Sequence, residues 1–243
     1  MKYYVYCVQV VTGGWDRSAN IYTIDGLHDS DVSNEPQTTN KRQKLGSIKL
    51  AVASNIQTIQ PKLSLTNIHS DCITNVLMPI PNILYTASMD HTINQYDIHH
   101  QSSSDTPLST IKCNNSINSI DYSVDLNLLV TAHNDNIIRI YDQRTSHDAV
   151  HSLKQELQSH TQWCNTVRWQ NHINYNSNQL CSGSYDKSIK LWDIRSTVPL
   201  YTITSHTDKV LSLDWYQDNI ISGGADNALQ CHTTNVQQNK ENV

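Results

Sequence analysis

The segment SGSYDKSIKLWD, residues Ser182–Asp193, is the most informative part of the chain for its fold. A run of small residues leads into a turn that holds Asp186, and the residues after the turn alternate between apolar and polar as far as Trp192. Alternation with a period of two predicts half-buried β-strands, and a small polar segment between two such runs predicts a turn. The stretch therefore predicts two short strands joined by a turn.

The same pattern occurs five times along the chain. Each copy has Ser or Thr four residues before an Asp and an aromatic residue or His six residues after it. The five turn residues are Asp16, Asp90, Asp135, Asp186 and Asp226. The spacing between consecutive Asp residues is 74, then 45, 51 and 40. A period near 40 to 45 residues indicates a repeat protein built from small sheets, and the long first spacing indicates an insertion.

A second repeated feature lies upstream of three of these turns. His69, His160 and His206 each open a strand pattern, with apolar residues four and seven positions later. The third unit has Asn114 or Asn115 where a His is expected. Each unit is thus interpreted as a His, a strand, a second strand with the hydroxyl residue, the Asp turn, a third strand that ends in an aromatic residue, and a fourth strand.

These features resemble the WD40 repeat. The resemblance implies an all-β fold of four-stranded blades arranged radially around a central channel. Because five Asp turns are found where the family has seven blades, we expect an incomplete β-propeller of about four to five of the seven blades.

The resemblance also implies a polar network in each blade. In the family the turn Asp bonds the His, whose other ring nitrogen meets the hydroxyl residue, which in turn meets a Trp. One unit has the full set, and we expect the other units to use partial sets with a structural role. The complete set is His160, Ser182, Asp186 and Trp192, and the remaining members are His69, Thr86, Asp90, His206, Ser222, Asp226, Asp16 and Asp135.

Composition limits the classes of function. The formal net charge of −5 argues against a broad grip on nucleic-acid phosphates, which needs a surplus of Lys and Arg. The six cysteines have no CxxC pair and no disulfide-dense spacing, so we expect a reducing compartment and small buried thiols. No apolar run approaches the 18 residues of a membrane-spanning helix, so no membrane partner is expected.

Two strings invite a catalytic interpretation, namely 69–71 (HSD) and 206–208 (HTD). Catalytic triads are defined by geometry across a fold and not by adjacency, and these strings recur where each unit begins. The SxxK match at 184–187 lies in the repeated turn and lacks the partner motifs of that chemistry. The twelve His residues include no HExxH motif and no Cys/His cluster. We therefore expect no catalytic residue, metal or cofactor.

The chain divides into four segments. We expect a partial blade at 1–24, a polar insertion loop at 25–60, the four further Asp-turn units at 61–232 and a polar tail at 233–243. The insertion contains a basic cluster of Lys41, Arg42 and Lys44. A receptor for nuclear import captures such exposed basic residues, although short basic runs in loops are also commonly just solvated charge. Both interpretations of the cluster stay open.

A narrower resemblance rests on longer strings near the carboxyl terminus. The segments 182–196 (SGSYDKSIKLWDIRS), 206–215 (HTDKVLSLDW) and 221–227 (ISGGADN) are similar to the last blades of the WDR12/Ytm family. That resemblance implies a non-enzymatic subunit of the complex with Pescadillo and the BOP/Erb-type WD-repeat protein. It further implies a role in large-subunit pre-rRNA processing and 60S assembly in the nucleus, nucleolus and nucleoplasm.

The chain also departs from that family. The ubiquitin-like domain that the family presents to the midasin AAA ATPase has no counterpart in the sequence, so the midasin link is in doubt and we expect an amino-terminally truncated form. A different WD40 adaptor, such as a substrate receptor of a ubiquitin ligase, remains the main alternative. A propeller enzyme would need convergent acids or metal ligands at the channel, and the sequence offers none.

One rim of the propeller is expected to bind partners. Loops before the first strand and between the second and third strands share this rim, and Trp, Tyr and long basic side chains are enriched in protein interfaces. We expect Trp163, Tyr185 and Lys209 to contact a partner. Trp15, Met89 and Asn134 lie on the same rim, where Met89 and Asn134 can equally serve only to fill turns.

Overall fold

The structure, a computed structural model, describes residues 8–24, 60–98, 106–144, 153–170 and 178–234. In these ranges the regular elements are β-strands, which pair into five antiparallel sheets. The same ranges contain no helix of the length and apolar character required to cross a membrane. We refer to the five sheets as blades 1 to 5 in chain order.

The blades contain three or four strands each. Blade 1 consists of β1 (Val8–Gly13), β2 (Ala19–Ile24) and β3 (Leu63–Leu65). Blade 2 consists of β4 (Ile73–Ile80), β5 (Ile83–Ser88), β6 (Thr92–Asp97) and β7 (Ser109–Lys112). Blade 3 consists of β8 (Ile117–Ser123), β9 (Leu128–His133), β10 (Ile137–Asp142) and β11 (Leu153–Gln158). Blade 4 consists of β12 (Cys164–Trp169), β13 (Gln179–Ser184), β14 (Ile189–Asp193) and β15 (Tyr201–Ile203), and blade 5 of β16 (Val210–Tyr216), β17 (Asn219–Gly224) and β18 (Leu229–Thr233).

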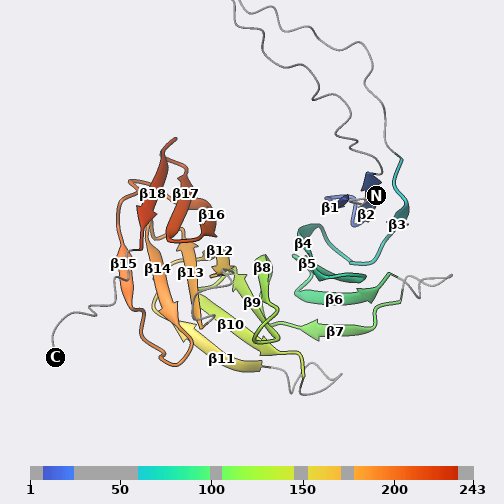
Figure 1. Cartoon of the computed structure of the whole chain (residues 1–243), viewed down its shortest axis with the longest axis horizontal. Coiled ribbons are helices and arrows are strands. Elements are labelled where there is room, and N and C mark those ends of the chain that lie inside the picture. The colour runs from blue at the N-terminus through green and yellow to red at the C-terminus, as the bar shows by residue number, and fades with distance from the viewer. Residues whose placement is uncertain (1–7, 25–59, 99–105, 145–152, 171–177, 235–243) are drawn as a thin grey trace, which may run out of the picture.

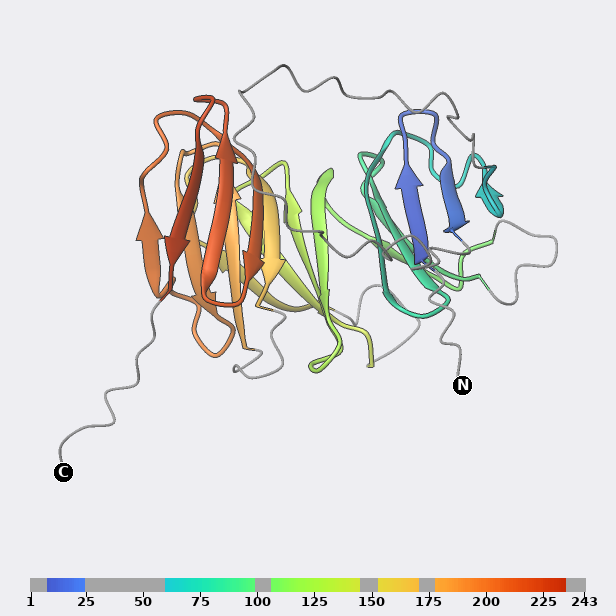
Figure 2. The ribbon, with the colours of Figure 1, turned by 45° about the horizontal axis from the view of Figure 1, so that its top comes forward.

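The blades follow one another in an arc around a common centre (Figure 1). Their inner strands contact in succession, β4 with β8, β8 with β12 and β12 with β16, and β1 of blade 1 contacts β4. The arc is open between blade 1 and blade 5, and the oblique view shows the strands of each blade side by side (Figure 2). The prediction of an all-β, incomplete propeller is therefore confirmed.

The two terminal blades contain different sets of three strands. In blade 1 the Asp turn joins β1 to β2, so these strands correspond to the second and third strands of the repeat, and β3 is the fourth. Blade 5 has the first three strands. Since β3 pairs with β2 across the insertion, blade 1 resumes after residue 60, and the expected boundary between residues 60 and 61 divides a blade.

The apolar core lies between neighbouring blades. Leu128, Val130 and Ile138 of blade 3 pack against Val167 and Trp169 of blade 4, all at most 1% exposed. Leu129 and Tyr141 of blade 3 pack in a second cluster with Tyr85 of blade 2, so this central blade is covered on both faces. This arrangement corrects the expectation that these strands are half-buried.

Two basic side chains show most clearly that the strands are covered on both faces. Lys190 and Arg139 occupy polar positions of the alternating pattern, yet only 8% and 5% of their surfaces are exposed. Lys190 Nζ donates to the hydroxyl of Thr202 at 3.1 Å, and Arg139 forms ion pairs within blade 3. Each buried charge keeps a polar partner, as burial of a charge requires.

The described cysteines are free thiols in different settings. Cys72, Cys164 and Cys181 are buried, Cys113 is half-buried and Cys231 is exposed on the last strand. Burial raises the pKa of the Cys181 thiol well above its usual value. Such thiols act as small apolar core residues rather than as nucleophiles, which require the thiolate.

Candidate functional site

Blade 4 contains a continuous chain of buried polar contacts. His160 Nδ1 lies 2.8 Å from Asp186 Oδ2, and His160 Nε2 lies 2.8 Å from Ser182 Oγ. The indole N–H of Trp192 donates to the same hydroxyl oxygen at 2.8 Å. Because the carboxylate only accepts, Nδ1 donates a hydrogen bond to it. The four residues expected to form the network are brought together.

The Asp186 carboxylate is held as an anion. Besides His160, it accepts hydrogen bonds from the backbone N–H of Thr161 at 3.0 Å and from the backbone and hydroxyl of Ser188 at 3.0 and 2.6 Å. Burial alone would raise the pKa of Asp186, but the hydrogen bonds from His160 and Ser188 outweigh it and hold that pKa below its usual range. A carboxylate with this many donors fixes the turn and is not free to act as a base.

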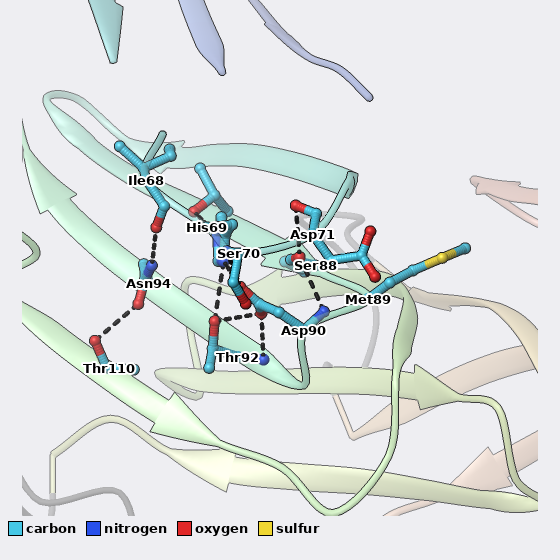
Figure 3. Close-up of polar contacts among 12 residues, drawn as sticks. Ile68, His69, Ser70, Asp71, Ser88, Met89, Asp90, Thr92, Asn94 and Thr110 are labelled. Carbon is cyan, nitrogen blue, oxygen red and sulfur yellow. Dashed lines mark hydrogen bonds and ion pairs between the residues drawn. The ribbon is translucent and has the colours of Figure 1, made fainter. Parts of the chain in front are cut away.

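Blade 2 repeats the arrangement with Thr in place of Ser (Figure 3). His69 Nδ1 lies 2.9 Å from Asp90 Oδ2, and Nε2 lies 2.7 Å from Thr86 Oγ1. The neighbouring Asp71 carboxylate instead accepts the backbone N–H of Cys72 at 2.7 Å. His69 is therefore oriented by a residue 21 positions away, and the HSD string at 69–71 does not form a triad.

Blade 5 keeps the His, hydroxyl and Asp but has His232 where blade 4 has Trp192. His206 Nδ1 lies 3.0 Å from Asp226 Oδ2, and Nε2 lies 2.8 Å from Ser222 Oγ. His232 contacts the hydroxyl of Ser205 at 3.0 Å instead of joining the Ser222 hydroxyl. The N–H of Thr207, followed by His206 and the N–H of Ala228, lowers the pKa of Asp226 to about 2.

Blade 3 satisfies its turn Asp with different donors. Asn115 Nδ2 donates to Asp135 Oδ2 at 2.7 Å, so Asn115, and not Asn114, takes the role of the missing His. Arg139 Nη2 lies 3.0 Å from the same oxygen, and its Nε lies 3.0 Å from Glu156 Oε1. The alternating pattern does not reveal the roles of Arg139 and Glu156, because it assigns both side chains to solvent.

A buried His lies beside this alternative network. His133 Nε2 is 2.6 Å from Thr131 Oγ1, and its Nδ1 is 3.3 Å from the carbonyl oxygen of Asn115. Burial, reinforced by the positive charge of Arg139, lowers the pKa of His133 to about 4. His133 is thus neutral in the folded protein at pH 7.

Blade 1 has the turn residue without a described His. Asp16 Oδ1 accepts the backbone N–H of Ser18 at 3.2 Å, and this bond and the Ser18 side chain lower the pKa of Asp16. The basic cluster of Lys41, Arg42 and Lys44 lies outside the described residues.

A second set of contacts links the inner strands and was not expected from the sequence. The pairing of each inner strand with its neighbour is irregular around its second residue, which is Thr74, Asn118, Asn165 or Leu211. A β-bulge redirects a side chain, and in three blades this side chain reaches a carbonyl of the next inner strand. The bonds are Thr74 to Ile117 at 2.7 Å, Asn118 to Cys164 at 2.8 Å and Asn165 to Leu211 at 2.6 Å.

The three residues expected on the partner-binding rim lie together. The rings of Trp163 and Tyr185 have centroids 5.8 Å apart, and Lys209 Nζ lies 4.8 Å from the Tyr185 centroid. Trp163 precedes β12, Tyr185 follows β13 and Lys209 precedes β16, so the group joins blade 4 to blade 5. The cation–π contact restricts the Lys209 side chain at an exposed position.

Two hollows open beside this group. One, of about 630 Å³, is bounded by Trp163, Tyr185, Lys209 and polar residues of two blades, and the other, of about 500 Å³, also receives Trp15 and Met89. Both hollows share Asn134, Trp163 and Tyr185. Trp15 is 87% exposed and Trp163 is 50% exposed. Large aromatic surface at an end of the propeller is suited to contact with another macromolecule.

The described residues contain no group of three or more His, Cys, Asp and Glu side chains that could hold a metal ion. The His residues nearest to carboxylates, His69, His160 and His206, have both ring nitrogens occupied by the blade networks. The arrangement of these side chains supports folding rather than ligand binding.

Comparison with known proteins agrees with the geometry. Residues 105–142, 151–193 and 197–233 match the family model described as "WD domain, G-beta repeat". Each match covers the outer strand of one blade and the first three strands of the next, namely β7 to β10, β11 to β14 and β15 to β18. The matched residues are therefore WD repeats.

This WD-repeat chain is also similar to proteins named "Ribosome biogenesis protein WDR12 homolog". It is 33% identical to the protein from Aedes aegypti, over 94% of this chain and 49% of that protein. It is 36% identical to the one from Drosophila virilis (90% and 46%) and 26% identical to the one from Arabidopsis thaliana (91% and 48%). The resemblance to the WDR12/Ytm family is confirmed, and the chain spans about half the length of the curated relatives it matches.

Proposed function

We propose that this chain is the propeller portion of a non-enzymatic scaffold protein that acts in ribosome biogenesis. The observation that carries the proposal is the similarity over at least 90% of the chain to relatives whose names state that role. The proposed locations are the nucleus, the nucleolus and the nucleoplasm, where large-subunit precursors are assembled.

In its finer form the proposal assigns the protein to a complex with a Pescadillo-type protein and a BOP/Erb-type WD-repeat protein. Within this complex the protein supports processing of the large-subunit pre-rRNA, which yields 5.8S and 25–28S rRNA, and assembly of the 60S subunit. The narrower sequence resemblance supports this assignment. No contact with the midasin AAA ATPase is assigned to the residues of this chain.

The geometry suits a scaffold rather than an enzyme. The side chains that resemble catalytic groups, such as His160 and Asp186, are buried and bonded to each other in the blade network. The rim side chains Trp163 and Lys209 are exposed, and the networks beneath them fix the turns that carry them. A rigid frame that presents an exposed aromatic group is the arrangement expected of a protein-binding surface.

The proposal is tested by immunoprecipitation of the tagged protein from nuclear extract, with its companions identified by mass spectrometry. We expect Pescadillo-type and BOP/Erb-type proteins with large-subunit precursors, and we expect depletion of the protein to lower the yield of mature 25–28S and 5.8S rRNA. Recovery of ubiquitin-ligase subunits without ribosomal precursors would contradict the proposal and favour a different WD40 adaptor.

A matched pair of variants makes this test specific for the rim. Trp163→Ala, Tyr185→Ala and Lys209→Glu together should reduce the recovery of ribosomal partners without unfolding the protein. The control is Val124→Ala, a change of an exposed side chain in the turn between β8 and β9, at the opposite ends of these strands from the Asp turns. Equal recovery of ribosomal partners by the triple variant and the control would show that the rim does not bind them.

A further inference from the structure

The two hollows on the rim form one continuous surface of mixed character. Their shared residues are Asn134, Trp163 and Tyr185, and the outer hollow extends to Lys209 while the inner one extends to Trp15 and Met89. Both hollows combine aromatic side chains with polar ones, and the outer hollow also contains a cationic side chain. A ligand that follows this surface needs an apolar group and a polar or charged group close together.

The charge of the outer hollow is set by one side chain. Two charged side chains line the outer hollow, Asp135 and Lys209. The Asp135 carboxylate accepts from Asn115 and is paired with Arg139 at 3.0 Å. The ammonium of Lys209 contacts the Tyr185 ring and has no carboxylate partner among the described residues. The outer hollow thus presents one positive charge without an ion-pair partner among the described residues.

Side-chain amides surround this charge. Asn134, Asn136 and Gln162 line the outer hollow, and their amide groups have no hydrogen-bond partner among the described residues. Each amide offers both donors and an acceptor. These groups can hydrogen-bond the backbone of an extended segment, which exposes alternating N–H and C=O groups.

We propose that this surface binds an acidic linear segment of a partner protein, in which an Asp or Glu side chain pairs with Lys209 and a nearby aromatic or aliphatic side chain covers Trp163. This inference names the kind of segment that the rim recognises and rests on the proposed function of that rim. Charge complementarity selects the occupant, since the free charge of the hollow is a single cation beside exposed aromatic surface.

Single-stranded RNA is the less suitable occupant. Binding of a phosphate chain needs several cations in a row, because each neutralised phosphate contributes through release of counterions. The outer hollow has one free cation among the described residues, Asp208 directly precedes it, and the chain has a formal net charge of −5. A single carboxylate next to an apolar side chain requires no more than this surface provides.

The test begins with selection from a displayed library of random nonapeptides against the purified protein. We expect enrichment of peptides with Asp or Glu within about three residues of Phe, Trp or Leu. The best peptide is then synthesised with a fluorescein label, and its affinity is measured by fluorescence anisotropy. Enrichment of basic peptides, or no enrichment, would overturn the inference, as would displacement of the peptide by an equimolar uridine dodecamer.

Variants of Lys209 and Trp163 test the charged contact and the aromatic contact separately. Lys209→Glu should weaken binding of the labelled peptide at least about fivefold and Lys209→Arg should restore it, because only the charge is reversed in the first variant. Trp163→Ala should weaken binding roughly thirtyfold, as loss of an aromatic anchor does. The control Lys187→Glu reverses the charge of an exposed Lys in the turn next to Tyr185 that lines neither hollow, and it should leave the affinity within about twofold. Equal effects of Lys209→Glu and Lys187→Glu would show that binding depends on net charge and not on this site.

The outcomes distinguish this inference from the proposed function. If the wild-type protein recovers large-subunit precursors and selects no acidic peptide, the inference fails while the scaffold role stands. If it binds acidic peptides through Lys209 and recovers no ribosomal precursor, the scaffold role fails while the assignment of the surface stands.

Discussion

Blades 3 and 4 share a backbone plan and differ in what holds their turns. In blade 4 the Asp186 carboxylate is bonded by His160, which is linked through Ser182 to Trp192. In blade 3 the Asp135 carboxylate is bonded by Asn115 and Arg139. The hydroxyl residue of blade 3, Thr131, contacts His133 of the same strand.

The comparison shows that the turn Asp is the constant part of the unit and that its donors are interchangeable. A buried carboxylate is costly unless several N–H or O–H groups bond it, and any donor set that meets this need stabilises the turn. His160 and Asn115 each supply one N–H, and Arg139 adds a charge that is shared with Glu156. Blade 3 therefore has an Arg–Asp ion pair where blade 4 has a His–Asp contact.

We expect the largest loss of stability when the Asp at the turn of blade 4 is removed. Asp186→Ala leaves the ring N–H of His160 and the backbone N–H groups of Thr161 and Ser188 without their acceptor. We expect the free energy of unfolding to fall by about 3 kcal/mol in urea denaturation, since breaking a buried polar pair leaves its partner unsatisfied. Asp186→Asn, which keeps one acceptor oxygen, serves as the control and should lose less. A loss below about 1 kcal/mol for Asp186→Ala would contradict the role given to this network.

The second prediction concerns acid and blade 3. The folded-state pKa of His133 is about 4 and its unfolded value is about 6.5, so the unfolded chain takes up the proton first as the pH falls. The stability that neutral His133 contributes is thus complete above pH 6.5 and is lost as the pH falls towards 4.

Unfolding measured between pH 7 and pH 4 tests this sign. Between pH 7 and pH 4 the free energy of unfolding of the wild-type protein should fall by about 2 kcal/mol more than that of His133→Gln, because the Gln side chain does not titrate. Parallel stability curves for the two proteins would show that His133 titrates alike in the folded and unfolded states.

The third prediction tests the ion pair that distinguishes blade 3. Arg139→Met replaces a buried guanidinium by an apolar side chain of similar length, and it also removes the buried Nη1, which has no partner in the described structure. Asp135 keeps its bonds from Asn115 and the N–H of Ile137. We expect a loss of about 1.5 kcal/mol, because Asp135 keeps these two donors and Glu156 is half-exposed to water.

Thermal unfolding of the Arg139→Met protein provides the measurement. Glu156→Gln, which removes only the half-exposed partner, is the control and should change the stability by less than about 1 kcal/mol. A loss from Arg139→Met as large as that from Asp186→Ala would mean that the two donor sets are not alternatives.

The fourth prediction compares the loss of stability on substitution of two aromatic residues at equivalent positions of blades 4 and 3. Trp192→Phe removes a hydrogen bond to the Ser182 hydroxyl at 2.8 Å and part of a buried indole ring, whereas Tyr141→Phe removes only a contact of 3.4 Å with the Cys113 sulfur. Trp192→Phe should destabilise by about 1 to 2 kcal/mol and Tyr141→Phe by less than about 0.5 kcal/mol. If urea denaturation shows equal losses of unfolding free energy for the two variants, the hydrogen bond from Trp192 to Ser182 does not stabilise blade 4.

The sequence predicts the elements that depend on local spacing. The five Asp turns and the strands around them follow from a hydroxyl residue, an Asp and an alternating run within a dozen positions. The roles of Arg139 and Lys190 do not follow, because a pattern of alternation does not reveal that a sheet is covered on both faces. The bonds of Thr74, Asn118 and Asn165 also escape prediction, since they depend on bulges that change the register between strands.

Sedimentation of nuclear extract on a sucrose gradient tests the proposal that this propeller acts in large-subunit assembly through its rim. We expect the tagged protein to sediment with 60S precursors, and we expect substitution of Trp163, Tyr185 and Lys209 together to move it to the light fractions. Sedimentation of the wild-type protein in the light fractions, or sedimentation of the triple variant with the precursors, would contradict the proposal.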